Sequence, residues 1–313
     1  MLKKRILLIG GHGFLGSNIL SWIDSNLLPY DVSVLSRRAR TRATNFNCIK
    51  EELYGNFANR EFLAKALSGR HFDYVFHCLS TTVPANSNEN IVEDIESNLI
   101  ATIQLLEIFK HSNSKVVFFS SGGAIYGNSK SIIHKEEDAP HPISSYGILK
   151  NCIEQYISIY HNLFGLKYIN LRISNPYGPF HSSNSQGIIN IAIRKTLMNE
   201  PIEIWGDGNN LKDYIFSEDI PAILFQVLEK GIENTTINIG SGHGVSLNSI
   251  LDIIKKFHSE LKVNYKEPRS HDVTQFVLDI SALLRHVDFQ LTPIESGIRK
   301  TYLWQKHEFQ NNL

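Results

Sequence analysis

A short apolar run near the start of the chain ends directly in a group of regularly spaced glycines. Residues 6–9 are Ile-Leu-Leu-Ile, and Gly10, Gly13 and Gly16 follow them. At a strand-to-helix turn, such glycines let the backbone approach a pyrophosphate and let the helix pack against the strand. Free N–H groups at the start of the helix can then bind the anion. The spacing therefore predicts a dinucleotide-binding turn between a first strand and a first helix.

Apolar runs and amphipathic stretches alternate through the first half of the chain. We expect strands at residues 5–9, 31–35, 74–77, 116–119 and 168–171, and helices at residues 14–25, 61–67, 95–109 and 146–160. Strands that alternate with helices form right-handed crossovers and a parallel sheet that is covered on both faces. The predicted fold class is α/β, a Rossmann-like doubly wound parallel sheet with a smaller C-terminal α/β substrate domain.

The sequence changes character after Asn175, where prolines, glycines and polar residues cluster. Beyond this point we expect helices at residues 188–198, 246–257 and 294–304, a strand at 202–205, and strands at 214–216 and 237–239 that return to the main sheet. We therefore predict two domains. Residues 1–175, with returns at about 212–240, would bind the dinucleotide, and residues 176–211 and 241–313 would bind the substrate.

The charge composition excludes several classes of function. Lys+Arg 31 balances Asp+Glu 31 in 313 residues, so the chain has no basic field for nucleic acid or an anionic membrane. The apolar runs are too short for a signal-peptide core or a membrane span. Cys48, Cys78 and Cys152 lie far apart, which suits reduced thiols. We expect a cytoplasmic protein without a nucleic-acid or membrane partner.

The thirteen histidines show no metal-ligand spacing, and we predict no metal site. His77 lies in a predicted buried strand, so we expect it to be a core residue. His12, inside the glycine loop, is expected to face solvent.

A basic tripeptide stands about 20 residues after the glycines, where a carboxylate would bind the ribose hydroxyls of NAD. The sequence there reads Ser36-Arg37-Arg38. It has no carboxylate to repel a 2′-phosphate, and two guanidinium groups can pair with one. A solvated basic loop is the alternative, because Arg40 and Arg42 continue the run. We predict that NADP(H) is favoured over NAD(H).

Tyr146 and Lys150 form a Tyr-x-x-x-Lys motif at the start of a predicted helix. This spacing places the phenol and the ammonium on one face of the helix. Deprotonating an ordinary tyrosine at pH 7 costs about 4 kcal/mol, which a nearby Lys150 and a positive nicotinamide would partly offset. We therefore predict that Tyr146 moves the proton of a substrate hydroxyl while the cofactor moves a hydride.

Together with further motifs, these features resemble the extended short-chain dehydrogenases/reductases, in the NAD(P)-dependent nucleotide-sugar epimerase/dehydratase family. The matching pieces are GGHGFLGS, VFHCLSTTVPANSN, NLIATIQLLE, FFSSGGAIYG, SSYGILK, LRISNPYGP, IWGDGNNLKDYIFSEDI, NIGSG and the late Arg269-x-x-Asp272-Val273. They run from residue 6 to about residue 280. The resemblance implies an enzyme that binds NAD(P) and a nucleotide sugar, and a homodimer built from two helices per subunit.

By position, the resemblance also implies roles for individual residues. For the cofactor these are Gly10, Gly13, Phe14, Leu15 and Gly16 at the pyrophosphate, Asn56 at the adenine, Leu79 and Ser80 at the ribose side, and Lys150 at the nicotinamide ribose. For the substrate they are Thr81 and Thr82 at the sugar, Asn175 at the diphosphate, Lys212 at a phosphate, and Arg269 and Asp272 at the nucleotide.

Departures from the family pattern bear on the choice of reaction. The position of the family's catalytic Ser or Thr is Gly122 here, and we expect the adjacent Ser121 to replace it. Gly123 and Ala124 stand where the dehydratases carry Asp-Glu, which argues against a 4,6-dehydratase. Lys212 replaces an arginine, so a point charge remains but the bidentate fork is lost.

Three functions remain open. The first is NADPH-dependent reduction of the 4-keto group of a nucleotide-activated 6-deoxyhexose, for example dTDP-4-dehydro-6-deoxyglucose to a dTDP-6-deoxyhexose such as dTDP-fucose, for lipopolysaccharide O-antigen or another surface polysaccharide. The second is a UDP-sugar 4-epimerase of the UDP-glucose/UDP-galactose type with bound NAD. The third is a non-catalytic dinucleotide sensor, against which the intact Tyr146–Lys150 pair argues. The basic tripeptide favours the first, because a consumed hydride donor suits NADPH.

Overall fold

A seven-stranded parallel sheet forms the centre of the computed structural model, which describes residues 3–39, 45–82, 87–127, 129, 131–268 and 275–311. In spatial order its strands are β3 (Ile49–Tyr54), β2 (Tyr30–Ser36), β1 (Lys4–Ile9), β4 (Tyr74–His77), β5 (Lys115–Ser121), β7 (Lys167–Ile173) and β11 (Thr235–Ile239). The strand order reverses between β1 and β4, and sheets of this kind bind ligands at the carboxyl ends of the strands there. The predicted doubly wound parallel sheet is confirmed.

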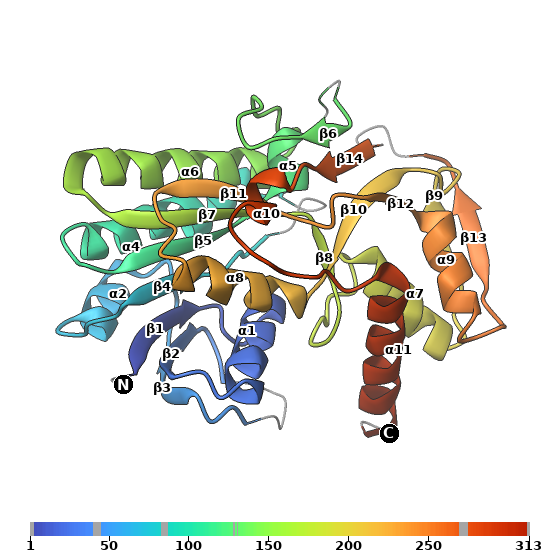
Figure 1. The fold of residues 1–313 in the computed structure, drawn as a ribbon, viewed down its shortest axis with the longest axis horizontal. Coiled ribbons are helices and arrows are strands. Elements are labelled where there is room, and N and C mark those ends of the chain that lie inside the picture. The colour runs from blue at the N-terminus through green and yellow to red at the C-terminus, as the bar shows by residue number, and fades with distance from the viewer. Residues whose placement is uncertain are drawn as a thin grey trace.

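Helices cover both faces of this sheet (Figure 1). One face carries α1 (Phe14–Ser25) and α8 (Asp219–Glu229), and the other carries α2 (Arg60–Leu67), α4 (Ala101–Phe109) and α6 (Ser145–Phe164). Successive side chains of a strand point to opposite faces. Leu7 and Leu8 of β1 therefore enter different apolar layers, and both are completely buried.

The helix expected at residues 95–109 is not a regular α-helix. It starts earlier, as α3 (Ile91–Asp94), widens into the π-helix η1 (Ile95–Ile100) and continues as α4. A π-helical turn rotates the following side chains relative to an α-helix and often occurs at functional sites. The apolar periodicity of the sequence could not reveal this local widening.

A second sheet lies beside the first and contains a strand that we expected in the main sheet. Its order is β12 (Gly244–Ser246), β10 (Leu211–Phe216), β14 (Gln275–Leu278) and β6 (Ile133–His134), with β8 (Asn175–Tyr177) also paired to β10. The expected return of residues 214–216 to the main sheet is therefore wrong. The buried carboxylate of Asp213 accepts hydrogen bonds from the backbone N–H groups of Ser241 (2.8 Å) and Leu278 (3.1 Å), which hold β10 in the second sheet. The strand at residues 237–239 does return, as part of β11 beside β7.

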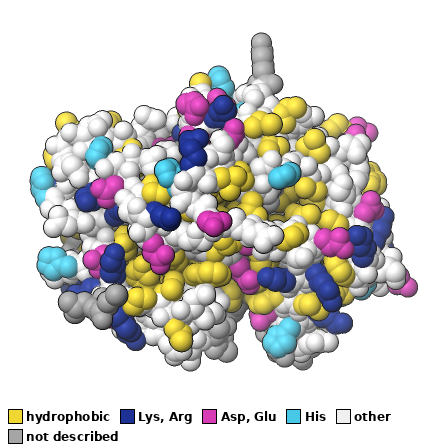
Figure 2. All heavy atoms as spheres, viewed as in Figure 1, with side chains coloured by type: hydrophobic (Ala, Val, Ile, Leu, Met, Phe, Trp, Pro, Cys, Tyr) yellow, Lys and Arg dark blue, Asp and Glu magenta, His cyan; other side chains and the backbone are white. Residues whose placement is uncertain are grey.

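The remaining elements pack around a separate apolar cluster at one end of the molecule (Figure 1). They are α7 (Ile188–Leu197), α9 (Leu247–Lys255), α11 (Ile294–Asn311) and the paired strands β9 (Ile202–Trp205) and β13 (Val263–Lys266), while the short helices α5 (Gly122–Tyr126) and α10 (Ser281–Leu284) lie between the sheets. In the part of the chain that the structure describes, no helix is long and apolar enough to cross a membrane. Figure 2 shows acidic and basic side chains interspersed over one face, as the balanced composition predicts.

Candidate cofactor and catalytic site

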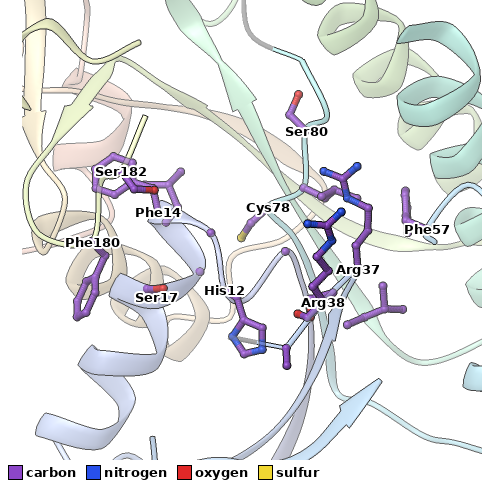
Figure 3. Close-up of a pocket in the computed structure, with 18 of the residues that line it drawn as sticks. His12, Phe14, Ser17, Arg37, Arg38, Phe57, Cys78, Ser80, Phe180 and Ser182 are labelled. Atoms are coloured by element: carbon purple, nitrogen blue, oxygen red, sulfur yellow. The ribbon is translucent and has the colours of Figure 1, made fainter. Parts of the chain in front are cut away.

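The glycine loop between β1 and α1 borders a cavity of about 680 Å³ (Figure 3). Gly10 has a φ of +81°, and a Cβ atom there would lie 3.1 Å from the backbone of Leu79. A Cβ atom on Gly16 would lie 2.5 Å from the carbonyl oxygen of Gly10. Gly13 caps α1, and the first turn of this helix lines the cavity. The loop therefore presents a helix N-terminus to the cavity, the arrangement that a pyrophosphate requires.

Most residues predicted to bind the cofactor line this cavity. They are Gly10, Gly13, Phe14, Leu15, Gly16, Ser36, Arg37, Arg38, Leu79 and Ser80. Asn56 is not among them, although its neighbours Gly55 and Phe57 are. The Asn56 Oδ1 atom instead accepts a hydrogen bond from the Ala58 backbone N–H (3.1 Å), in the turn that leads into α2.

The end of β2 lies next to the glycine loop, because the Gly10 N–H donates to the Leu35 carbonyl oxygen (2.9 Å). Arg37 and Arg38 are exposed, and both extend along one side of the cavity (Figure 3). The Ser36 hydroxyl donates to the Arg38 carbonyl oxygen (2.9 Å) and shapes this turn. None of the described residues that line the cavity is acidic. This edge is therefore positively charged.

The structure corrects the expectation for His12. Its side chain is only 10% exposed, and its Nε2 atom lies 2.8 Å from a carboxylate oxygen of Glu52 on β3. The contact ties the glycine loop to the edge strand of the sheet. We did not predict β3, so its partner in the loop could not be foreseen.

Residues from the second half of the chain close the cavity, and we assigned none of them to the cofactor from the sequence. They are Phe180, Ser182 and Gln186. Asn18 of α1 fixes their approach: its side-chain amide donates to the Pro179 carbonyl oxygen (3.0 Å), and its Oδ1 atom accepts from the Ser217 hydroxyl (3.0 Å). The glycine loop and the loop after β8 therefore meet across the cavity.

Tyr146 and Lys150 lie in the first turns of α6. The Lys150 ammonium donates to the Phe119 carbonyl oxygen of β5 (2.8 Å) and lies 5.6 Å from the centre of the Tyr146 ring. Burial lowers the pKa of Lys150 to about 8, although Cys78, Glu154 and, more weakly, Asp94 oppose this shift. Lys150 therefore changes charge close to neutral pH.

The phenol of Tyr146 behaves differently from what we expected. Burial raises its pKa to about 12, and a hydrogen bond with Ser121 opposes this shift only in part. The expected lowering by Lys150 is not seen, because the shift comes from burial, the Ser121 hydrogen bond and the charge of Asp94. In this protein Tyr146 is a phenol at neutral pH.

Ser121, the last residue of β5, is the hydroxyl next to Tyr146. At the adjacent Gly122, a Cβ atom would lie 2.8 Å from Cδ2 of Leu278 on β14, so a side chain there would require the tip of this leucine to shift. The second sheet thus packs closely against the position where the resemblance expects a Ser or Thr. It leaves Ser121 as the hydroxyl within reach of the phenol.

A buried carboxylate that we did not single out from the sequence lies beside this pair. Asp94 is 1% exposed. Its Oδ1 atom accepts from the Thr82 hydroxyl (2.5 Å) and the Asn98 amide (2.8 Å), and its Oδ2 atom accepts from the Ser145 hydroxyl (2.9 Å). Asn98 in turn accepts from the Thr81 N–H (3.0 Å). Asp94 at the end of α3 and Asn98 in the π-helix therefore fix both threonines that we assigned to the sugar.

The residues predicted for the diphosphate lie on the second sheet. Asn175 of β8 donates to the Asp213 carbonyl oxygen of β10 (2.7 Å), and Lys212 precedes Asp213. Neither Asn175 nor Lys212 lines the cavity at the glycine loop or a second, smaller cavity beside Tyr146 and Lys150. Arg269 and Asp272 lie outside the described residues.

Known proteins with similar sequences and structures include both epimerases and a reductase that act on nucleotide sugars. Residues 6–240 match the NAD dependent epimerase/dehydratase family. A Methanocaldococcus jannaschii protein named "Putative UDP-glucose 4-epimerase" is 33% identical over 96% of this chain and 98% of its own length. The dTDP-4-dehydro-6-deoxyglucose reductase of Escherichia coli is 28% identical over 95% and 96%. The structure of a UDP-glucose 4-epimerase with UDP-glucose from Thermotoga maritima aligns with a TM-score of 0.90 and 30% identity, over 97% and 99% of the two chains.

Proposed function

Since the chain belongs to the NAD dependent epimerase/dehydratase family, we propose that it transfers a hydride between a nicotinamide cofactor and carbon 4 of a nucleotide sugar. The finer proposal is an NADPH-dependent 4-ketoreductase of a nucleotide-activated 6-deoxyhexose. It would convert dTDP-4-dehydro-6-deoxyglucose to a dTDP-6-deoxyhexose such as dTDP-fucose, a building block for surface polysaccharide. The E. coli relative, a dTDP-4-dehydro-6-deoxyglucose reductase, supports this substrate class.

The observation that carries the choice of cofactor is the basic edge of the cavity. Arg37 and Arg38 border it at the end of β2, and no acidic side chain stands among the described lining residues. A 2′-phosphate can pair with two guanidinium groups, while a carboxylate at this place would repel it. NADPH is a consumed hydride donor, which suits a reductase.

The residues around Tyr146 fit ketone reduction. When the cofactor is bound, it would supply the hydride that reaches carbon 4 of the sugar. Tyr146, whose pKa burial raises to about 12, holds a proton at neutral pH and would donate it to the 4-keto oxygen. Ser121 would donate a hydrogen bond to the same oxygen, and Lys150 would bind the nicotinamide ribose. The phenolate would then regain its proton from solvent, so that ketone, hydride and proton give the alcohol.

We assign the substrate to the carboxyl end of the sheet and the second sheet. Thr81 and Thr82 would contact the sugar, and Asn175 and Lys212 would bind the diphosphate. The division into a dinucleotide domain of residues 1–175 with returns at about 212–240, and a substrate domain of residues 176–211 and 241–313, belongs to the same proposal, except that β10 joins the second sheet. Asp213 places Lys212 in the second sheet, which supports a role on the substrate side.

A UDP-sugar 4-epimerase that retains NAD is the second candidate. The M. jannaschii relative carries that name, and the T. maritima structure is a UDP-glucose 4-epimerase. Such an enzyme would oxidise carbon 4 and return the hydride to the other face of the same sugar. It would use the same Tyr146–Lys150 pair without net consumption of cofactor.

We also propose a homodimer through the outer faces of two helices. Large apolar side chains stay exposed there: Ile91, Val92, Ile100 and Ile108 along α3 to α4, and Ile148, Tyr156, Ile159, Leu163 and Phe164 on α6. Apolar side chains gathered on neighbouring helices form the kind of patch that a second subunit covers.

The cofactor proposal is tested by turnover with NADPH and with NADH in the Arg37→Ala variant. With dTDP-4-dehydro-6-deoxyglucose as substrate, the ratio of kcat/KM for NADPH to that for NADH should fall about tenfold or more, because a charge-assisted pair is lost. Arg60→Ala, at an exposed arginine away from the cavity, is the control and should leave the ratio unchanged. An equal loss of kcat/KM with NADPH and with NADH would show that Arg37 does not bind a 2′-phosphate.

A further inference from the structure

Asp94 is a buried carboxylate in the catalytic site that the proposed reaction does not use as an acid or a base. It lines a second, smaller cavity together with Tyr146 and Lys150. We propose that Asp94 is a positioning residue: it fixes the first turn of α6, and with it the Tyr146 hydroxyl, to the π-helix and to Thr82, and it serves as the counter-charge of Lys150. This inference deepens the proposed function and rests on it.

The hydrogen bonds of Asp94 join three separate segments of the chain. Thr82 comes from the segment after β4, Asn98 from the π-helix, and Ser145 from the start of α6. Both carboxylate oxygens are used, and the side chain is closed off from solvent. A movement of α6 would break at least one of these bonds, so the carboxylate fixes the helix relative to the residues assigned to the sugar.

The segment that carries Asp94 also holds the backbone of the catalytic turn. The Ser145 N–H donates to the Asn88 side chain (2.9 Å), and the Tyr146 N–H donates to the Ser87 hydroxyl (3.1 Å). Residues 87–94 therefore bond to the backbone of Ser145 and Tyr146 and, through Asp94, to the side chain of Ser145. A shift of about 1 Å at a reacting group can lower the rate about a hundredfold. We therefore expect these hydrogen bonds to support catalysis by keeping Tyr146 in place.

The charge of Asp94 acts on both catalytic groups. It raises the pKa of Tyr146 and opposes the lowering of the Lys150 pKa. The other titratable groups around Lys150 are Cys78, Glu154 and His77. Burial lowers the pKa of His77 to about 3, so this imidazole is neutral, and burial keeps the Cys78 thiol protonated. Asp94 and Glu154 are thus the carboxylates near the lysine, and Glu154 is also paired with the Arg172 guanidinium (2.8 Å).

Asp94→Asn separates the charge from the hydrogen bonds. The amide oxygen can face Thr82 and Asn98, and the amide N–H can donate to the Ser145 hydroxyl, which can accept. With the geometry kept and the charge removed, we expect the pH profile of kcat to move to lower pH, because the pKa values of Tyr146 and Lys150 both fall. Asp94→Ala should lower kcat about 10- to 100-fold, with a smaller effect on KM.

Two further variants keep the test decisive. Ser145→Ala removes one hydrogen bond but leaves the charge, so it should lower kcat without moving the pH profile, even if Asp94→Ala fails to fold. Asp219→Asn is the matched control, because this buried carboxylate also accepts bonds from Thr292 but lines neither cavity. An unshifted profile in Asp94→Asn would overturn the role as counter-charge.

A direct titration of Tyr146 separates this inference from the proposed reaction. Tyrosine labelled with ¹³C at Cζ reports ionisation by NMR, and Tyr146→Phe identifies the resonance. With NADP⁺ bound, Tyr146 should titrate at a lower pH in Asp94→Asn than in the wild type and in Asp219→Asn. Identical titration in all three proteins would contradict the inference. Absence of turnover with either sugar nucleotide would refute the proposed function alone.

Discussion

Tyr146 and Lys150 stand one helical turn apart, and burial pushes their pKa values in opposite directions. Burial favours the neutral form of each group, which raises the pKa of the phenol and lowers that of the ammonium. The sequence motif identified both residues, since their i,i+4 spacing on a helix brings them together. It could not identify Asp94, which lies about 50 residues earlier and approaches them only in the fold.

Lys150 predicts a specific pH dependence. The pKa of this base is lowered to about 8, so the ammonium is present below this pH and is lost as the pH rises through it. We expect kcat/KM to fall above about pH 8. Tyr146, with a pKa near 12, loses its proton much later. Lys150→Arg should remove this alkaline limb if the variant stays active, because arginine remains charged. If kcat/KM of the wild type stays constant up to pH 10, the charge of Lys150 has no role in turnover.

A second prediction concerns the Ser121 hydroxyl. Ser121→Ala should lower kcat about 10- to 100-fold, because a hydrogen bond to the reacting oxygen is lost. Adding Gly122→Ser should not restore the rate, since the new side chain would press against Leu278. Steady-state kinetics of the single and double variants check this. If kcat recovers in the double variant, Leu278 on β14 can move aside and position 122 can hold the hydroxyl.

Sequence patterns predicted some strands correctly and missed or misplaced others. Apolar runs between clear turns predicted β4 and β9 at their observed bounds. The edge strand β3 was missed because its sequence, Ile49–Tyr54, is rich in charge and only half-buried. The assignment of residues 214–216 to the wrong sheet has another cause. Asp213 selects the sheet through contacts with Ser241 and Leu278, and no local pattern encodes such contacts.

The glycine loop allows a test of steric fit at the level of an element. Gly16→Ala should destabilise the fold by about 2 kcal/mol or more and weaken binding of the dinucleotide, because its Cβ atom would overlap the Gly10 carbonyl. Gly69→Ala is the control: this glycine has a φ of +69° but open space around it, so only backbone strain of about 1 kcal/mol is expected. Thermal unfolding and nucleotide titration give both values. Equal effects in the two variants would contradict the role of close packing.

At the scale of the whole molecule, the site forms where distant segments meet. The glycine loop, the catalytic turn of α6 and the loop after β8 are far apart in the sequence, and Asn18 joins the first to the last. Contiguous motifs could therefore predict the glycines and the Tyr-x-x-x-Lys pair. Phe180 and Gln186 at the cavity could not be predicted, because only the packing of the second sheet brings them there.

The proposed dimer is tested by a charge placed on its helix face. Leu163→Glu, on α6 at 68% exposure, should convert a dimer into a monomer, because a carboxylate would have to leave water in the interface. Leu303→Glu, on α11 at 55% exposure, is the matched control and should leave the mass unchanged. Light scattering after size exclusion measures both. A Leu163→Glu variant that remains dimeric would place the interface elsewhere.

The central claim is that NADPH delivers a hydride to carbon 4 of the sugar nucleotide. The most direct test supplies NADPH with deuterium at the transferred position, together with dTDP-4-dehydro-6-deoxyglucose, and locates the label in the product by NMR. The account predicts one deuterium at carbon 4 of the sugar for each NADPH oxidised. Unchanged NADPH, with UDP-glucose converted to UDP-galactose without label, would contradict it and identify a 4-epimerase that returns its own hydride.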